Sequence, residues 1–426
     1  MRKMPLSGLL VRQGVTMGIE LEQAVEIIRA QVSPVDETEI LGIGRLYGRI
    51  CAEDARAAFD IPPFNRSPLD GYAFLAQDSA GASMESPTEL AVIEDIFAGQ
   101  WPQKSVTPGT AARLMTGAPI PEGADCVIRQ EETIEETDEG SRRVRVFKEL
   151  SPFENFGRQG EDIERGGVLV RAGERLNYVH AGLLAGAGIA SIRVYRRPRV
   201  FLLVTGDELW LPMFGAPPPG KIYSSNHALL PARLGELGVE ALVADLCKDD
   251  GKAIAGNISQ VAQLADLVIT TGGVSVGARD LVPEALETLG AETLFHGLNL
   301  KPGTPAMFSL YGRLPILSLS GNPFAALATM ELLARPALAV LTRNGALELQ
   351  YENGVLENGF PTPSPGRRFI RGTASHGRVR LADGPHSSGV LGSLRGCNCL
   401  VDIPAGTGSL TAGDEVRLVR LRGAAE

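Results

Sequence analysis

Hydrophobic residues follow two different patterns along this chain, and the change between them falls near residue 198. From there to about residue 345, short apolar runs alternate with longer segments in which apolar residues recur at helical spacing. Strands are expected at 200–204, 239–246, 266–270 and 315–319, and helices at 225–238, 250–264, 281–290 and 324–341. This alternation predicts a doubly wound α/β domain, which binds ligands at the carboxyl ends of its strands.

On both sides of that region, apolar segments are shorter and are separated by glycine and proline. Within residues 61–151, β-like segments at 90–93, 111–115, 124–128 and 143–147 predict a small barrel or sandwich. After residue 345, similar segments at 368–372, 377–381, 398–403 and 415–421 predict a small C-terminal β-barrel.

Helical spacing also occurs in the first half of the chain. Residues 17–32 place apolar side chains along one face and end at a Ser-Pro pair, which predicts an amphipathic helix. Weaker patterns favour a second helix at 38–53, a helix at 179–190 and a basic linker at 193–199.

Composition narrows the class of protein. The chain has 426 residues, of which 44% are hydrophobic and 21% charged, as is usual for a folded soluble protein. We find no apolar run long enough to span a membrane and no signal-peptide pattern at the N-terminus. The net charge of −9 argues against general nucleic-acid binding, and the odd count of five cysteines favours a reducing cytoplasm.

A glycine-rich loop lies between the strand expected at 266–270 and the helix that follows it. The loop contains Gly272, Gly273 and Gly277 together with the hydroxyl of Ser275. Glycine lets a ligand approach the backbone closely, and amides at a helix N-terminus favour anions such as phosphate. A generic tight turn is the alternative for this loop alone.

Further loops at expected strand ends, at 205–209 and 320–323, also contain glycine. Three such loops on one sheet edge favour a phosphate-bearing ligand over a generic turn. Neither a P-loop nor a G-x-G-x-x-G motif occurs in the α/β region, and the five histidines are scattered without a catalytic or metal pattern.

Charged residues accompany these loops. Asp207, Glu208, Asp249, Asp250 and Asp280 are expected near strand ends, where carboxylates beside a phosphate would hold Mg²⁺. Helix capping is the alternative for the three aspartates at 249, 250 and 280. The C-terminal region carries an arginine group whose members could bind an anion or could be solvated strand faces: Arg367, Arg368, Arg371, Arg378 and Arg380.

Seven motifs in this order resemble the molybdopterin molybdenumtransferase family, which includes the MoeA proteins and the C-terminal domain of gephyrin. The motifs are Ser67-x-x-Asp-Gly-Tyr-Ala73, Thr116-Gly-Ala-Pro-x-Pro-x-Gly-Ala-Asp125, Gly160-Glu-Asp-Ile163, Thr205-Gly-Asp-Glu-Leu209, Gly272-Gly-Val-Ser-Val-Gly277 with Asp280, Lys301-Pro-Gly303 and Gly321-Asn-Pro323. Together they cover nearly the whole chain.

The resemblance implies four domains and a metal-insertion reaction. The domains are an elongated helical domain (1–60 and 152–197), an inserted β domain (61–151), an α/β molybdopterin-binding domain (198–345) and a C-terminal β-barrel (346–426). The implied protein is a cytoplasmic homodimer that uses Mg²⁺ to convert adenylylated molybdopterin and molybdate into molybdenum cofactor and AMP. A molybdopterin-adenylating protein and molybdoenzyme apoproteins are the implied partners.

Site residues follow from the motifs. The resemblance implies catalytic roles for Glu208, Asp249, Asp280, Lys301, Thr116 and Asp162, with Asp249 and Asp280 as the metal ligands. It implies substrate binding by Thr205, Gly206, Gly272, Gly273, Ser275, Gly277, Gly303, Gly321, Asn322, Pro323, Arg371 and Ser388.

Some positions depart from the family pattern. Gly297 and Thr304 stand where lysine is usual, which removes two positive charges from an oxyanion site. Ser224, Ser320 and Gly157 are further departures. A divergent paralogue is therefore the alternative, either a carrier or scaffold for molybdopterin or a protein that handles tungstate or another oxyanion. An unrelated sugar-phosphate or nucleotide enzyme is a more distant possibility.

Overall fold

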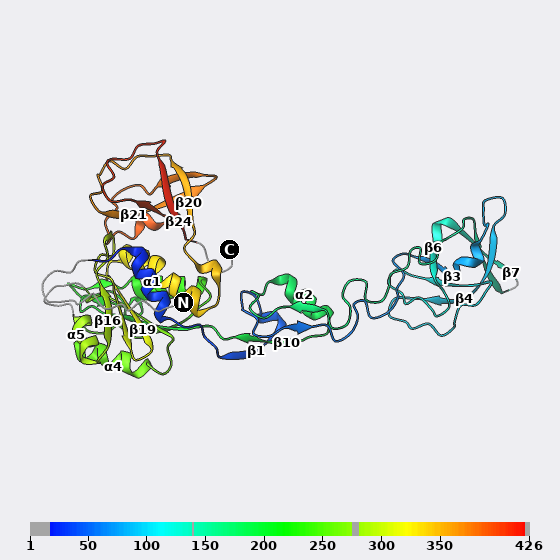
Figure 1. Ribbon diagram of the computed structural model, residues 1–426, viewed down its shortest axis with the longest axis horizontal. Coiled ribbons are helices and arrows are strands. Elements are labelled where there is room, and N and C mark those ends of the chain that lie inside the picture. Colours follow the sequence, from blue (N-terminus) through cyan, green and yellow to red (C-terminus); the bar gives the residue numbers. More distant parts are fainter. Residues whose placement is uncertain (1–17, 139, 275–280, 422–426) are drawn as a thin grey trace, which may run out of the picture. The chain divides into compact units, whose positions relative to one another are not determined.

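The structure is a computed structural model, and it describes residues 18–138, 140–274 and 281–421. The chain separates into two compact units. The first comprises Met1–Ile40, Gly48–Ala52 and Arg193–Glu426, and the second comprises Leu41–Tyr47 and Glu53–Ile192. The first unit contains an α/β part and a β-barrel, and the second contains a six-stranded sheet, so the α/β and β parts that the sequence predicts are present (Figure 1).

A six-stranded mixed sheet forms the centre of the first unit. In sheet order its strands are β14 (Glu240–Val243), β11 (Arg199–Val204), β15 (Leu267–Thr271), β19 (Leu314–Leu319), β18 (Met307–Tyr311) and β16 (Glu292–His296). The first four strands are parallel, and β18 and β16 are antiparallel to their neighbours. The four parallel strands were predicted, whereas β16 and β18 were missed.

Helices cover both faces of this sheet, which confirms the doubly wound architecture. The helices are α3 (Asn226–Glu236), α4 (Gly251–Val261), α5 (Leu281–Thr288), α6 (Pro323–Thr329) and α7 (Arg335–Leu341). Alternate residues of β11 enter two separate apolar cores. Leu202 and Val204 pack with residues of α3, α6 and α7, whereas Phe201 and Leu203 pack with residues of α4 and α5. This period of two is the geometry of a strand buried on both faces.

The segment Pro323–Leu341 is long and apolar enough to cross a membrane by length and composition, so the expectation that no run is long enough was wrong. Its most apolar window is 94% buried inside the protein, as is typical of a core helix. A π-helical turn at Met330–Ala334 joins α6 to α7. It contains the fully buried Glu331, which accepts hydrogen bonds from Arg233 and Arg335.

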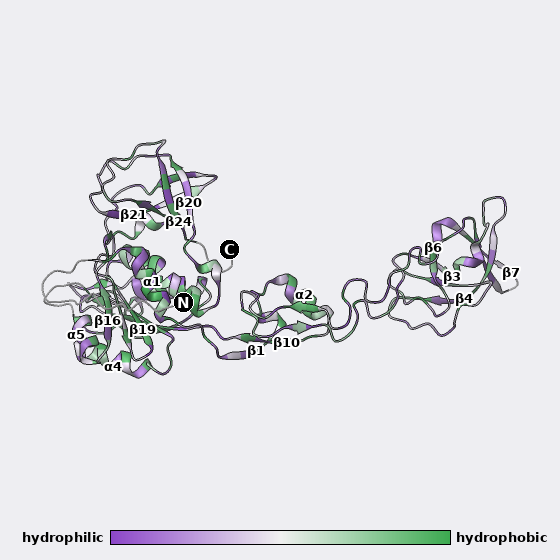
Figure 2. Ribbon diagram, viewed as in Figure 1, coloured by the Kyte–Doolittle hydropathy of each residue, from purple (hydrophilic) through white to green (hydrophobic). Residues whose placement is uncertain are grey.

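The amphipathic helix predicted at the N-terminus is α1 (Leu21–Gln31), on which hydrophobic and hydrophilic residues alternate (Figure 2). A capping box formed by Glu20 and Gln23 begins the helix. Its buried side chains pack with α7 in the core of the first unit. Accordingly, α1 belongs with the α/β part of the chain rather than with a separate helical part.

Five strands of the first unit close into the predicted C-terminal barrel. They are β20 (Tyr351–Leu356), β21 (Arg367–Ser375), β22 (Arg378–Leu381), β23 (Cys399–Ile403) and β24 (Glu415–Arg420). The ring closes because β21 pairs with β22 and β23, β20 pairs with β22 and β24, and β23 pairs with β24. A short strand of the α/β part, β17 (Leu300–Lys301), runs parallel to β21 and extends the same sheet.

The second unit contains the predicted β domain. Its six-stranded sheet has the order β6 (Cys126–Arg129), β3 (Gly71–Phe74), β5 (Thr110–Leu114), β4 (Thr88–Ile96), β8 (Ser141–Val146) and β7 (Thr133–Asp138). Two apolar clusters fill it. The remainder includes α2 (Tyr178–Gly186), which was predicted, and the antiparallel pair β2 (Ala55–Arg56) and β9 (Val168–Val170).

Two predicted elements differ from the structure. Residues 38–53 are not a helix, because β1 (Thr38–Gly42) and a 3₁₀ turn at Ile43–Arg45 occupy them. Gly48 there has a φ of +73°, a left-handed conformation that ends regular structure. The basic linker predicted at 193–199 is shorter than expected: its first three residues belong to β10 (Ser191–Tyr195), which forms a two-stranded sheet with β1, and only residues 196–198 connect β10 to β11.

Candidate functional site

Three loops meet at the carboxyl edge of the parallel strands. Thr205 follows β11, Gly272 follows β15 and Gly321 lies just after β19. The amide of Gly272 donates to the Leu319 carbonyl over 3.2 Å, and the amide of Thr205 donates to the Thr271 carbonyl over 2.9 Å. The predicted convergence of these glycine loops is therefore present in the structure.

Glycine is required at the tightest of these contacts. A Cβ atom on Gly272 would lie 2.4 Å from the Thr205 carbonyl oxygen, and the residue has a φ of +93°. A Cβ atom on Gly321 would lie 3.3 Å from the Cα of Gly272. The Asn226 side chain donates to the Gly321 carbonyl over 2.8 Å and fixes this loop from the side of α3. Such close backbone packing leaves main-chain groups along the edge where a phosphate could approach.

The other residues expected on this edge are Gly206, Gly273, Asn322 and Pro323, and each lies in one of the three loops. The Gly206 amide donates a hydrogen bond to the Cys247 carbonyl. Asn322 is the N-cap residue of α6, and Pro323 is its first residue. Ser275, Gly277 and Asp280 lie outside the described residues.

Reciprocal hydrogen bonds join Asp207 and Asp249 across this edge. The amide of Asp207 donates to the Asp249 carboxylate and the amide of Asp249 donates to the Asp207 carboxylate, each over 3.3 Å. Glu208 is exposed beside them. Asp250 instead caps α4 by accepting from the amides of Lys252 and Ala253, so the capping interpretation holds for Asp250. It does not describe Asp249, whose carboxylate accepts from the neighbouring loop.

No group of three His, Cys, Asp or Glu side chains within residues 18–138, 140–274 and 281–421 could hold a metal ion. The described part of the edge supplies two carboxylates, those of Asp207 and Asp249. Mg²⁺ is commonly held by one or two carboxylates together with substrate phosphates, so this pair fits such an ion in the presence of a phosphorylated ligand.

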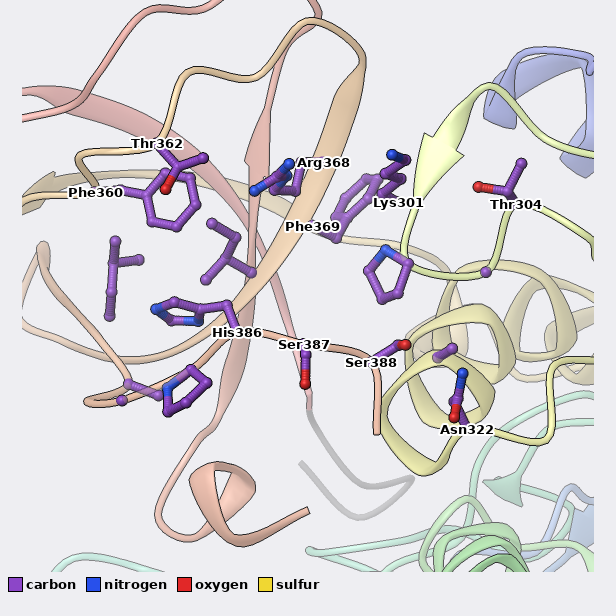
Figure 3. Close-up of a pocket in the computed structure, with 18 of the residues that line it drawn as sticks. Lys301, Thr304, Asn322, Phe360, Thr362, Arg368, Phe369, His386, Ser387 and Ser388 are labelled. Atoms are coloured by element: carbon purple, nitrogen blue, oxygen red, sulfur yellow. The ribbon is translucent and has the colours of Figure 1, made fainter. Parts of the chain in front are cut away.

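A cavity of about 990 Å³ lies between the α/β part and the barrel, within the first unit (Figure 3). The α/β part contributes Lys301, Thr304, Ser320 and Asn322 to its lining. From the barrel come Phe360, Thr362, Arg368, Phe369, Asp383, His386, Ser387 and Ser388. The cavity shares Ser320 and Asn322 with the loop after β19, and so adjoins the edge described above.

Two cations lie side by side in this cavity. Lys301 and Arg368 are register partners in the parallel pairing of β17 with β21. Register partners project from the same face of a sheet, and Figure 3 shows both side chains at the same part of the cavity wall. The structure therefore brings the predicted Lys301 together with one member of the arginine group.

The loop after Lys301 is packed tightly. Gly303 has a φ of +98°, and a Cβ atom there would lie 2.0 Å from the Thr329 side chain. Thr304 is exposed in the cavity lining, and its hydroxyl donates to the Leu300 carbonyl over 2.7 Å. Gly303 thus has a structural reason to be glycine, whereas Thr304 has room for a longer side chain.

Arg371 is fully buried and positions the loop that carries Ser388. Its guanidinium donates to the carbonyls of Pro385, Ser387 and Val390 and lies 4.0 Å from the ring centroid of Phe324. Burial lowers the pKa of this guanidinium. The Ser388 carbonyl in turn accepts from the Phe324 amide over 3.0 Å, so the loop is fixed to the start of α6.

His386 and Phe360 were missed by the sequence analysis. The rings of the two residues meet edge-on with centroids 5.5 Å apart, and the Arg368 guanidinium lies 5.5 Å from the centroid of Phe360. Burial lowers the pKa of His386, and the charges of Arg371 and Arg368 lower it further. No motif in the sequence marks His386 as a site residue, because only the folding of the barrel brings it to the cavity.

Thr116 and Asp162 both lie in the second unit. The amide and hydroxyl of Thr116 donate to the Asp70 carboxylate over 2.6 and 2.7 Å, and the hydrogen bond from the amide, followed by that from the hydroxyl, lowers the pKa of Asp70. Asp162 is exposed, and its amide donates to the Ile61 carbonyl over 3.1 Å.

The fold and this cavity define a multidomain protein with a doubly wound ligand-binding domain, an inserted β domain and a C-terminal barrel. Family models match the chain in the same order. They are the MoeA N-terminal region (domain I and II) at 19–188, the probable molybdopterin binding domain at 201–340 and the MoeA C-terminal region (domain IV) at 353–421.

Individual proteins agree with the family models. Molybdopterin molybdenumtransferase from Bacillus subtilis (strain 168) is 34% identical over 389 residues, which are 91% of this chain and 90% of that protein. The crystal structure of a molybdopterin biosynthesis MoeA protein from Pyrococcus horikosii has a TM-score of 0.83 at 30% identity and covers 95% of this chain and 100% of its own. A second one, from Pyrococcus horikoshii OT3, has a TM-score of 0.76 at 29% identity. The chain belongs to the MoeA family, and the resemblance seen in its motifs is confirmed.

Proposed function

We propose that this protein inserts molybdenum into molybdopterin as a transferase of molybdenum cofactor biosynthesis. We further propose that the substrate is adenylylated molybdopterin, so that the products are molybdenum cofactor and AMP. Family membership and the names of the relatives support this activity. The carrying observation is the cation pair of Lys301 and Arg368 in a cavity that adjoins the glycine loops.

In this proposal the cavity binds molybdate. Molybdate is a tetrahedral dianion, and Lys301 and Arg368 would donate charge-assisted hydrogen bonds to its oxygens. The hydroxyls of Ser387 and Ser388 line the same cavity and would donate to the remaining oxygens. Donors held in place before the substrate arrives need no reorganisation when charge shifts during the reaction.

The glycine loops would hold the phosphates of the pterin substrate. The loops after β11 and β15 lie on the edge next to Asp207 and Asp249. Since the amides of Thr205, Gly206 and Gly272 already donate to main-chain carbonyls, other groups of these loops would contact the phosphates. Mg²⁺ would be held there by Asp249, together with Asp280 as the motif implies or with Asp207 as the described geometry supports. When bound, this ion supplies charge neutralisation at the pyrophosphate.

One observation favours the alternative of a divergent paralogue. Gly297 is buried with a φ of +98°, and Thr304 supplies a hydroxyl where the family pattern has a charge. A site with fewer cations could bind the pterin without turnover, as a carrier or scaffold, or could select tungstate or another oxyanion.

The test is AMP release from adenylylated molybdopterin, measured with molybdate or tungstate and with or without Mg²⁺. The proposed activity predicts AMP and active cofactor only when molybdate and Mg²⁺ are both present. Bound pterin without AMP release at millimolar molybdate supports the carrier instead. Release with tungstate but not molybdate supports the oxyanion alternative.

We also propose that the protein acts as a cytoplasmic homodimer. The resemblance supports the dimer, and it supports a molybdopterin-adenylating protein and molybdoenzyme apoproteins as partners. The burial of the long apolar helix at Pro323–Leu341 and the net charge of −9 support a protein that binds neither membrane nor nucleic acid. Sedimentation of the full chain tests the dimer directly.

A further inference from the structure

We propose that His386 is the proton-transfer residue of the oxyanion cavity, taking a proton from a substrate thiol and delivering it to an oxygen of the bound oxyanion. This inference rests on the proposed function, because it needs a dithiol substrate and molybdate in the same cavity. It assigns a role to a side chain that none of the motifs contains.

The first argument is the position of the imidazole. His386 lines the same cavity as Lys301 and Arg368 and directly precedes Ser387 and Ser388. Figure 3 shows its ring inside the cavity, between Phe360 and Ser387. Edge-on packing against Phe360 at 5.5 Å fixes the ring on one side. The side chain is therefore held in the cavity that the proposed function assigns to the oxyanion.

The second argument is elimination among the side chains that line the cavity. Its titratable members are Lys301, Arg368, Asp383 and His386. Lysine and arginine remain protonated near neutral pH, and a carboxylate would repel a dianion. Asp383 is in addition paired with Arg380 over 3.2 Å. Serine and threonine hydroxyls donate hydrogen bonds but do not titrate in this range. Among the described residues that line the cavity, only the imidazole can therefore both accept and release a proton near neutral pH.

The third argument is the state of the ring. The Nδ1 atom of His386 is buried and has no hydrogen-bond partner among the described residues. The charged groups that act on the ring are Arg371 and Arg368, while Lys301 and Asp383 line the same cavity. Burial and the two arginines lower the pKa of the imidazole, so the neutral form, which can accept a thiol proton, is present at neutral pH.

The chemistry balances without an added oxidant or reductant. Molybdate and a dithiol give a trioxo species with two metal–sulfur bonds, and one water leaves. Two S–H bonds break, and both protons end on the oxygen that departs as water. Molybdenum keeps its oxidation state and the total charge stays at −2. A base that takes the thiol proton and returns it to the departing oxygen accelerates both halves of this exchange.

The test uses the full chain with His386→Gln, which keeps a polar side chain but cannot titrate. His376→Gln is the matched control, because His376 lies on an exposed turn between β21 and β22. Cofactor formation is measured from pH 5.5 to 8.5, and molybdate affinity is measured separately by calorimetry. We expect the rate to fall by about 100-fold or more in His386→Gln, as is typical for loss of a general acid–base group. Molybdate affinity should stay within about threefold of the wild type, since a neutral donor remains.

The pH profile distinguishes proton transfer from a structural role. The wild-type rate should decline at acidic pH as the imidazole becomes protonated, and His386→Gln should lose that decline. In His386→Ala, added imidazole should restore part of the rate. A rate within threefold of the wild type, an unchanged pH profile, or a parallel loss of molybdate affinity would each overturn the proposal. If the wild type itself forms no cofactor, the proposed function fails, and this inference fails with it.

Discussion

Lys301 and Arg368 provide the most direct test of the cavity as an oxyanion site. In Lys301→Ala and Arg368→Gln, one charged donor is removed while the strand pairing of β17 with β21, which is formed by the backbone, is kept. A hydrogen bond to a charged group contributes about 1.5–3 kcal/mol. This corresponds to a rise in the dissociation constant for molybdate of about 10- to 150-fold for each variant.

The structure predicts which of the two variants should lose more affinity for molybdate. Lys301 is exposed, so solvent screens its charge and its loss should fall near the lower limit. Arg368 is half-buried and packs over the Phe360 ring, so its loss should be larger. Because the two are register partners that approach one ion, the double variant should deviate from additivity by about 0.5 kcal/mol or more.

Calorimetric titration with molybdate at a fixed ionic strength of about 0.1 M measures these constants, since surface charges are screened in a salt-dependent way. Lys252→Ala on the exposed side of α4 is the matched control for loss of one positive charge. Wild-type affinity in both site variants, or a loss equal to that of the control, would refute an oxyanion site at this position.

Three further predictions concern stability and charge. Glu331→Gln, which leaves two arginines near a neutral buried amide, should destabilise the first unit by about 3–5 kcal/mol in chemical denaturation, and a loss below 1 kcal/mol would contradict the network. Arg142 holds the pKa of Asp95 below its usual range, so the contribution of this pair is present above about pH 4 and lost as the pH falls through the lowered pKa. The difference in melting temperature between wild type and Asp95→Asn should therefore shrink between pH 5 and about pH 2. Thr304→Lys should tighten molybdate binding by up to about 10-fold, whereas Gly297→Lys should lower stability by about 1–2 kcal/mol because of its left-handed backbone.

The α/β part was predicted well because burial on both faces leaves a strong signal in the sequence. The runs at 200–204 and 267–269 are apolar at every position, so both faces of each strand must be buried, and the helices between them have clear apolar faces. The edge strand β16 was missed because its exposed and buried residues mix, and its neighbour β18 was missed because its apolar run is short and contains Ser309. Residues 38–53 were misread because glycine-broken apolar spacing resembles a helix until tertiary contacts are known.

Part of the site could be read from local sequence, and part depends on long-range register. Glycine loops after β11, β15 and β19 were predictable, since each lies next to its own strand. The proximity of Arg368 to Lys301 could not be predicted, because it depends on the pairing of β17 with β21. Arg371 shows the opposite case, in which a residue assigned to substrate binding by motif is fully buried and holds the loop at 385–390.

The charge balance of the cavity bears on the departures from the family pattern. Glycine at 297 and threonine at 304 remove two lysines, yet the pairing of Lys301 with Arg368 still presents two positive charges side by side. Two charges match a dianion, and guanidinium donors form a fixed fork that suits a tetraoxo ion. Lysine at Gly297 would require a buried charge on a left-handed backbone, so that position is closed to the usual residue by its conformation. If the cavity is the proposed oxyanion site, binding should depend on Arg368 to a degree that the motif comparison alone does not indicate, and the rank order of the two single variants tests this.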